Sequence, residues 1–190
     1  MLSRSGDLLF LRNRSDEALS AFRETQQILQ GLAIADTQNA NYQRDLSVSC
    51  NKLGDLMTAL GNGDDAQHYF QQALNIAEKL ARAEPQRADY QRDLSVSYIK
   101  LGDLMKALGN SDDAQRYFLQ AFNIAEKLAR AEPQRAEYQR DLVISLMRMA
   151  DMDAQRAETY LEQGLSILQA LKRSGRQVAQ RDEIMAWLEG

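Results

Sequence analysis

The chain contains two consecutive segments of 48 residues, 42–89 and 90–137, that differ at only eight positions. A period of this size is typical of solenoids, in which each unit packs only against its neighbours along the chain. Such a protein presents an extended surface built from similar units rather than one enclosed active site. The repeat therefore predicts a binding surface, and catalysis would be an unexpected addition.

The repeat extends on both sides of these two segments. A third, divergent unit begins with the same YQRDL motif at Tyr138, loses about five residues in its middle, and occupies residues 138–173. Upstream, Gly6-Asp7-Leu8 stands 48 residues before Gly54-Asp55-Leu56, so residues 1–41 form a partial unit. Since the chain begins inside a unit, we expect it to be a piece of a longer protein.

Each unit is predicted to contain two helices. In the first, apolar residues share one helical face at spacings of four and three: Leu46, Cys50, Leu53, Met57 and Leu60. Gly61-Asn62-Gly63 ends this helix, and a second apolar face follows from Ala66 to Leu80. Pro85 ends the second helix, because the residue before a proline is disfavoured in helical geometry. Alternating β-branched runs are absent from the sequence, which indicates an all-α chain of eight or nine helices.

Composition excludes several classes of function. The net charge of −4 argues against a nucleic-acid partner, which would favour a basic surface. The single cysteine cannot form an internal disulfide, so a reducing, cytoplasmic location is the simplest expectation. The apolar run Leu8 to Leu11 is too short for a signal peptide or a membrane span, and we expect no membrane partner.

Groups for catalysis or metal binding are scarce. His68 and Cys50 are the only histidine and cysteine, and the next unit replaces them with Arg116 and Tyr98. A nucleophile–base pair or a metal site needs several such groups together. We therefore expect a protein that is not an enzyme and binds no metal or cofactor, with His68 exposed and Cys50 a buried, inert thiol.

Small and aromatic residues recur at fixed spacing in the two segments. Those of the second are Tyr98, Leu101-Gly102, Ala114, Phe118 and Ala121, and those of the first are Cys50, Leu53-Gly54, Ala66, Phe70 and Ala73. This spacing resembles the tetratricopeptide repeat signature, in a long-helix variety similar to arrays in large bacterial proteins. The resemblance covers residues 1–173 and implies a right-handed superhelical solenoid of antiparallel helix hairpins that mediates protein–protein interaction.

In the family that the chain resembles, the first helix of each pair lines a concave groove. The stripe facing it would comprise Arg44, Val48, Asn51, Asp55 and Thr58, then Arg92, Val96, Ile99, Asp103 and Lys106, then Arg140, Ile144, Met147 and Asp151. We expect this stripe to bind a peptide or helix of a partner protein, read at the variable positions Asn51, Ile99 and Met147. The aspartates suit a partner that carries lysine or arginine.

A structural interpretation of the same residues stays open. Arg44 and its equivalents can instead bond the neighbouring repeat, and the pairs Lys52–Asp55, Lys100–Asp103 and Arg148–Asp151 can be solvated contacts within one helix. The array would then be a spacer or a self-assembly or regulatory arm of a larger signalling protein, without a dedicated groove ligand.

The two ends of the array are the other candidate surface. Residues 174–190 carry Val178, Ile184, Met185, Trp187 and Leu188 among charged residues. We expect a capping helix that folds onto the third unit, or alternatively a docking helix for another chain. At the other end, the apolar residues 8–11 suggest self-association through the repeat ends.

Overall fold

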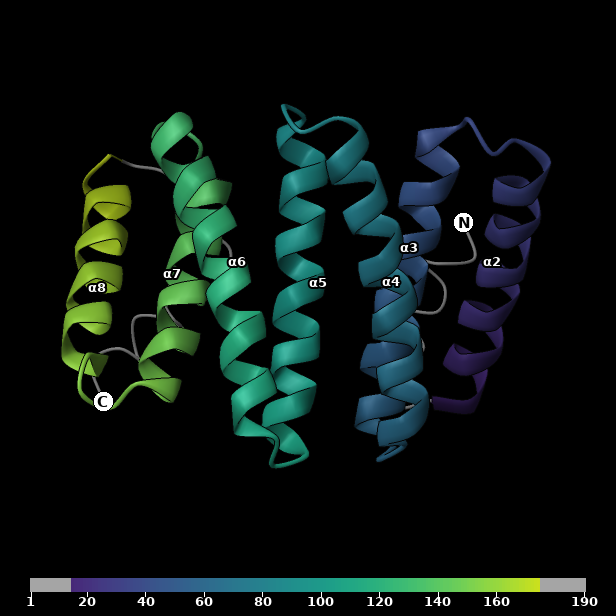
Figure 1. Ribbon diagram of the computed structural model, residues 1–190, viewed down its shortest axis with the longest axis horizontal. Helices are drawn as coiled ribbons and strands as arrows, with labels where there is room; N and C mark the ends of the chain where they lie inside the picture. The colour runs from purple at the N-terminus through teal and green to yellow at the C-terminus, as the bar shows by residue number, and fades with distance from the viewer. Residues whose placement is uncertain (1–14, 175–190) are drawn as a thin grey trace. The chain divides into compact units, whose positions relative to one another are not determined.

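The computed structural model of the protein describes residues 15–174 (Figure 1). Within this range it contains seven helices and no strand: α2 (Ser15–Ala35), α3 (Ala40–Ala59), α4 (Gly63–Ala83), α5 (Ala88–Ala107), α6 (Ser111–Ala131), α7 (Ala136–Met152) and α8 (Ala157–Arg173). The predicted apolar start at residues 8–11 lies outside the described residues. So does the predicted C-terminal helix, apart from its first residue.

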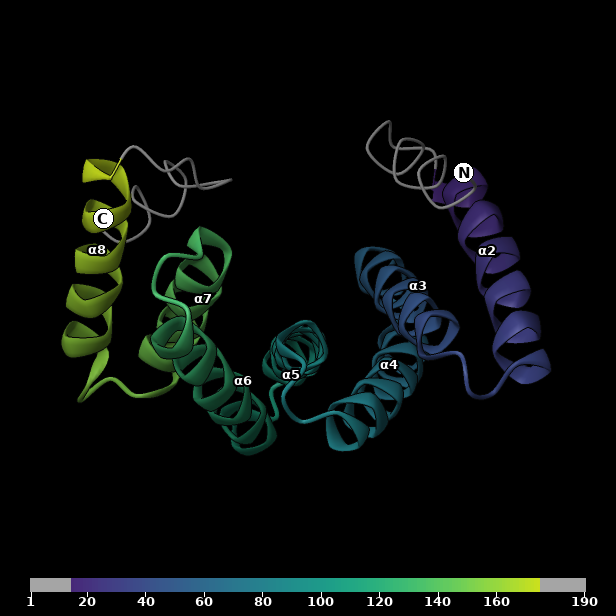
Figure 2. The ribbon, with the colours of Figure 1, turned by 90° about the horizontal axis from the view of Figure 1, so that it is seen from above.

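The chain divides into two compact units at the turn between Gly109 and Asn110. In the first unit, neighbouring helices run antiparallel, and α3 packs against α2, α4 and α5 (Figures 1 and 2). In the second unit, α7 packs against both α6 and α8 (Figure 2). Antiparallel helix hairpins that contact their sequence neighbours are the architecture of a helical repeat, which confirms the predicted fold class.

The predicted turn signals end the helices where expected. Helix α3 ends at Ala59, and Gly61 takes a left-handed φ of 75°, a conformation that glycine adopts without steric cost. Asn62 is the N-cap of α4, and two aspartates occupy the first turn of that helix. Helix α4 then ends at Ala83, two residues before Pro85.

Helix lengths account for the 48-residue unit. Helices α3 and α5 have 20 residues, and α4 and α6 have 21. Helices α7 and α8 have only 17 residues each. The third unit is thus shorter because both of its helices are shorter.

The glutamine of the YQRDL motif links each first helix to the preceding second helix. Its Nε2 donates to a carbonyl in the last turn of that helix: Gln43 to Ala33 at 3.3 Å, Gln91 to Ala81 at 3.2 Å and Gln139 to Ala129 at 2.9 Å. Carbonyls in the last turn have no partner inside their own helix. The glutamine therefore satisfies one of them in each unit.

Gly54 of α3 packs directly against the Phe70 ring of α4. A Cβ atom added to this buried glycine would lie 2.4 to 2.8 Å from three ring atoms of Phe70 on α4. Phe70 is 2% exposed, so its ring has little room to move. The glycine–phenylalanine pair of the predicted signature is thus a direct contact between the helices of one hairpin.

We predict that Gly54→Ala lowers the free energy of unfolding by about 1 to 2 kcal/mol, because overpacking against Phe70 exceeds the gain in helix propensity. Gly31→Ala is the matched control, since a Cβ there meets nothing within 4 Å, and it should raise stability by about 1 kcal/mol. Urea unfolding measures both. A Gly54→Ala protein that is stabilised as much as Gly31→Ala would contradict the contact.

Candidate functional site

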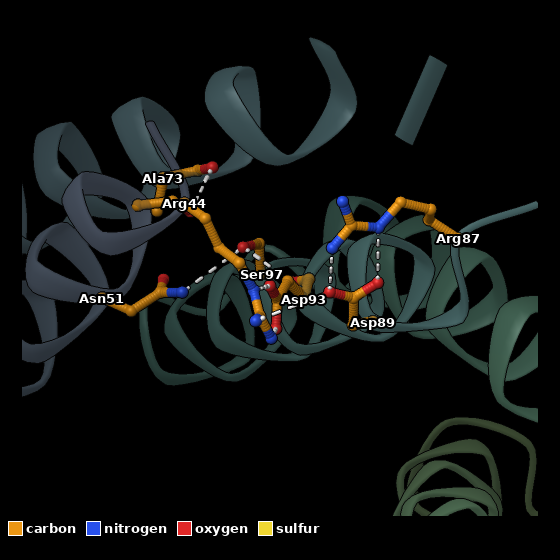
Figure 3. Close-up of polar contacts among 8 residues, drawn as sticks. Arg44, Asn51, Ala73, Arg87, Asp89, Asp93 and Ser97 are labelled. Atoms are coloured by element: carbon orange, nitrogen blue, oxygen red, sulfur yellow. Dashed lines mark hydrogen bonds and ion pairs between the residues drawn. The ribbon is translucent and has the colours of Figure 1, made fainter. Parts of the chain in front are cut away.

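The predicted groove residues of the first unit form what we call the first-helix stripe. It consists of Arg44, Val48, Asn51, Asp55 and Thr58 on α3, and of Arg92, Val96, Ile99, Asp103 and Lys106 on α5. Because α3 packs against α5, side chains of the stripe on one helix can reach the other (Figure 3). Three residues of α3 do so through hydrogen bonds or ion pairs.

Arg44 makes the most extensive of these links. Its Nε donates to Asp93 Oδ2, and its Nη2 donates to Asp93 Oδ1 at 3.3 Å (Figure 3). Its Nη1 also lies 3.5 Å from Asp89 Oδ2. The hydrogen bond with Asp93 raises the pKa of Arg44 above its ordinary value. The guanidinium thus bonds a neighbouring repeat, as the structural interpretation of the sequence proposed.

Asp89 connects this link to the turn that precedes α5. Arg87 donates to it from Nε at 3.1 Å and from Nη2 at 2.8 Å (Figure 3). The Arg87 guanidinium also stacks on the Tyr90 ring, 4.0 Å from its centroid. The hydrogen bond from Arg87 lowers the pKa of Asp89 below its ordinary value, with a smaller contribution from Arg44.

Two further links follow along the helices. Asn51 Nδ2 donates to Ser97 Oγ at 3.3 Å. Lys100 Nζ donates to the two carboxylate oxygens of Asp55 at 2.7 and 2.9 Å. Asp55 is therefore bonded by a lysine of the next first helix, whereas the sequence suggested a lysine of its own helix. Together with the Arg44 link they form what we call the α3–α5 polar seam.

The stripe residues of the first unit that lie outside the polar seam are exposed or half-buried. Val48 is 42% exposed and lies between Arg44 and Asn51 on the stripe. Thr58 is exposed, although its Oγ1 donates to the Gly54 carbonyl at 2.9 Å. On α5, Lys106 is exposed, and the others are half-buried: Arg92, Val96, Ile99 and Asp103.

The second unit places its predicted groove residues differently. Met147 is 8% exposed and belongs to an apolar core with Val143, Leu168 and Leu171. Ile144 packs against that core, Arg140 is half-buried and Asp151 is exposed. Met147 therefore fills space between α7 and α8 and leaves little surface for a ligand.

Sequence reasoning did not pair these residues of α5 with α3, and it assigned Lys100 to Asp103 instead. Asp93, Ser97 and Lys100 bond residues that lie 49, 46 and 45 positions earlier. These separations are close to the 48-residue period, so the signal was present in the repeat itself. A search for complementary side chains one period apart would have found the seam.

The remaining reactive groups, Cys50 and His68, each lie within hydrogen-bond distance of Gln72. Cys50 is 1% exposed, with Gln26 Nε2 at 3.7 Å and Gln72 Oε1 at 3.6 Å from Sγ, and burial raises the pKa of its thiol to about 11. The predicted burial of Cys50 is thus confirmed, and His68 is exposed as expected. Across residues 15–174, no three histidine, cysteine or acidic side chains are grouped for a metal ion. No helix in that range has the length and hydropathy to cross a membrane.

We predict that Asp55 and Lys100 are energetically coupled across the two repeats. A double-mutant cycle with Asp55→Asn and Lys100→Met should give a coupling of about 0.2 to 1 kcal/mol, since both side chains are partly exposed. Urea unfolding at low and high salt measures it, and screening should reduce the coupling at high salt. Additive effects at low salt would show that this pair does not stabilise the α3–α5 contact.

A second prediction concerns the stability of the folded protein at low pH. Because the pKa of Asp89 is lowered in the folded protein, its contribution to stability is present above the ordinary carboxyl pKa and is lost as pH falls through the lowered value. Asp89→Asn should therefore flatten the loss of stability below about pH 4. Asp36→Asn, an exposed aspartate in the turn before α3, is the control and should keep the parent slope. Equal slopes for all three proteins would refute the prediction.

Comparisons with known proteins agree with this architecture. A tetratricopeptide repeat family model matches residues 45–127. None of the curated protein sequences matches the chain. The crystal structure of BtubC (BKLC) from P. vanneervenii is similar, with a TM-score of 0.67 and 19% identity over 90% of this chain and 63% of that one. This chain thus spans less than two thirds of that protein.

A second similar structure is that of a thermophilic TPR protein from Thermus thermophilus. Its TM-score is 0.54, at 18% identity, over 98% of this chain and 79% of the other. At these identities the similarity concerns the fold alone. The family match, the helix hairpins and the glycine–phenylalanine contact together show that residues 45–127 are similar to tetratricopeptide repeats.

Proposed function

We propose that the protein is an interaction scaffold whose first-helix stripe on α3 and α5 binds a peptide or helix of a partner protein. The family fold is that of protein–protein interaction scaffolds, which are generally not enzymes. The observation that carries the finer proposal is Val48, an aliphatic side chain that is 42% exposed on this stripe. The polar seam fixes α3 against α5 on either side of it, so an apolar ligand group would meet a preordered surface.

The partner's charge follows from Asp55. Its side chain stays 43% exposed although Lys100 bonds both oxygens. A lysine or arginine of a ligand can therefore approach the carboxylate and share it with Lys100. The proposed partner segment carries an apolar side chain for Val48 and a basic group about two helical turns further along α3, near the exposed Thr58.

The seam itself supports a second candidate function. Arg44, Asn51 and Asp55 were expected to face a ligand, and each bonds the next first helix instead. Met147, expected at a variable groove position, is buried. These placements favour a spacer or self-assembly arm of a larger protein, in which the polar residues join repeats and no groove ligand exists.

Val48→Lys separates the two candidates. The side chain at this exposed position makes no bond in the seam, so the variant should fold like the parent. Its lysine removes the apolar contact with a ligand and repels a basic partner. The experiment is affinity capture from a lysate of the source organism, followed by mass spectrometry. Gln67→Lys, an exposed position on α4, is the matched control because it adds the same charge outside the stripe.

We expect at least one protein to be captured by the parent and by Gln67→Lys but lost with Val48→Lys. Circular dichroism and urea unfolding should confirm that all three baits are equally folded. If the three baits retain the same proteins, or none, the stripe does not recognise a ligand and the spacer function is favoured.

A further inference from the structure

Three of the eight differences between the two near-identical segments fall along one side of the second helix. The substituted residues of α6 stand three positions apart, and they are Arg116, Leu119 and Phe122 in place of His68, Gln71 and Leu74 of α4. Residues at this spacing are neighbours on a helix surface. In α4, Gln71 bonds Asn75 at 2.9 Å. In α6, Leu119 is 44% exposed, so the second unit carries an apolar side chain where the first presents a bonded amide.

Helix α8 places an aromatic ring and a guanidinium beside this side of α6. The rings of Phe122 and Tyr160 meet edge to face, with their centroids 6.3 Å apart. The Arg156 guanidinium lies over the Tyr160 ring, 5.9 Å from its centroid. Helices α6 and α8 run in the same direction, because α7 runs antiparallel to both (Figure 1). Leu119 and Arg156 therefore each lie about one turn before the aromatic contact. These four residues and Arg116 form what we call the second-helix patch.

Both arginines of the patch can donate to a ligand. The Arg116 side chain is 75% exposed, and its Nη2 bonds Asp113 one turn earlier. A guanidinium has five N–H donors, so this bond leaves others for a second acceptor. Arg156 is exposed as well. Its contact with Tyr160 uses the face of the guanidinium and leaves the N–H edge for a carboxylate.

The acidic residues that follow the patch along α6 and α8 are bonded or lie on another side of their helix. Glu126, one turn beyond Phe122, accepts a hydrogen bond from Arg130 Nη2 at 2.9 Å. On α8, Glu158 and Glu162 each follow a patch residue by two positions, which is about half a turn around the helix. The patch thus presents positive charge on a chain whose net charge is −4, and it complements an acidic ligand.

We propose that the second-helix patch binds a segment of a partner protein in which a carboxylate stands next to an aliphatic or aromatic side chain. The carboxylate accepts hydrogen bonds from Arg156 or Arg116, and the apolar side chain packs against Leu119 and the aromatic pair. Arginine and aromatic residues are the types that contribute most to protein interfaces. The proposal goes beyond the proposed function and does not depend on it, because the first-helix stripe lies on α3 and α5 of the first unit.

A peptide selection tests this proposal. The parent chain is the bait for a phage-displayed library of random linear peptides, and the enriched peptides are synthesised and titrated by fluorescence polarisation. The first variant gives the second unit the residues of the first: Arg116→His, Leu119→Gln and Phe122→Leu together. Because the first segment carries these residues in the same fold, the variant should stay folded. The second variant is Arg156→Glu, at an exposed position that precedes α8, where an acidic residue suits the helix dipole.

We expect enriched peptides in which an aspartate or glutamate lies beside an aliphatic or aromatic residue. Their affinity should fall about tenfold or more in each variant, as for the loss of an interface hot spot. Arg156→Glu should regain affinity when lysine replaces the acidic residue of the peptide. Val48→Lys, which alters the first-helix stripe, should leave the affinity unchanged. Circular dichroism checks that all of these proteins are equally helical.

Three results would overturn the proposal. They are a selection without an acidic and apolar consensus, peptides that bind either folded variant as tightly as the parent, and peptides whose binding is lost only with Val48→Lys. The last result would assign the peptides to the first-helix stripe and would support the proposed function. Failure of one proposal is therefore distinguishable from failure of the other.

Discussion

The contact between Gly54 and Phe70 is the constraint on which the first unit depends. It lets α3 approach α4 more closely than any side chain at position 54 would allow. With α3 held against α4 and α4 against α5, the stripes of α3 and α5 are brought near enough for side chains to bridge them. The polar seam is therefore a consequence of close hairpin packing, and its ion pairs add stability to an arrangement that sterics have already fixed.

The seam also explains differences between the two nearly identical segments. Asn51 bonds Ser97, whereas the equivalent Ile99 has no polar side chain. The replacement of Asp89 by Glu137 looks conservative, yet Asp89 holds Arg87 through two hydrogen bonds, whereas Arg135, the equivalent of Arg87, donates to Tyr138 Oη at 2.8 Å. The two equivalent arginines thus have different hydrogen-bond partners, although each stacks on the tyrosine three residues further along.

Joining repeats and binding a partner make competing demands on the same surface. A charge that is already bonded contributes less to a ligand, because the ligand must replace an existing hydrogen bond. Val48, Thr58, Lys106 and the exposed part of Asp55 are what the seam leaves available. Under the proposed function, the α3–α5 stripe would therefore bind a partner with one apolar and one basic anchor better than a partner read along every helical turn.

The sequence by itself determined the helices, their ends and the hairpin contact. Apolar spacing, Gly61 and Pro85 act locally, whereas the repeated glycine–phenylalanine pair was interpreted through the resemblance to the tetratricopeptide repeat signature. Only the tertiary structure decided the partners of Arg44 and Asp55 and the burial of Met147. The physical reason is that a long polar side chain can reach several acceptors at similar cost. Which acceptor the side chain bonds depends on the distance between helices that lie one period apart. No local sequence pattern specifies that distance.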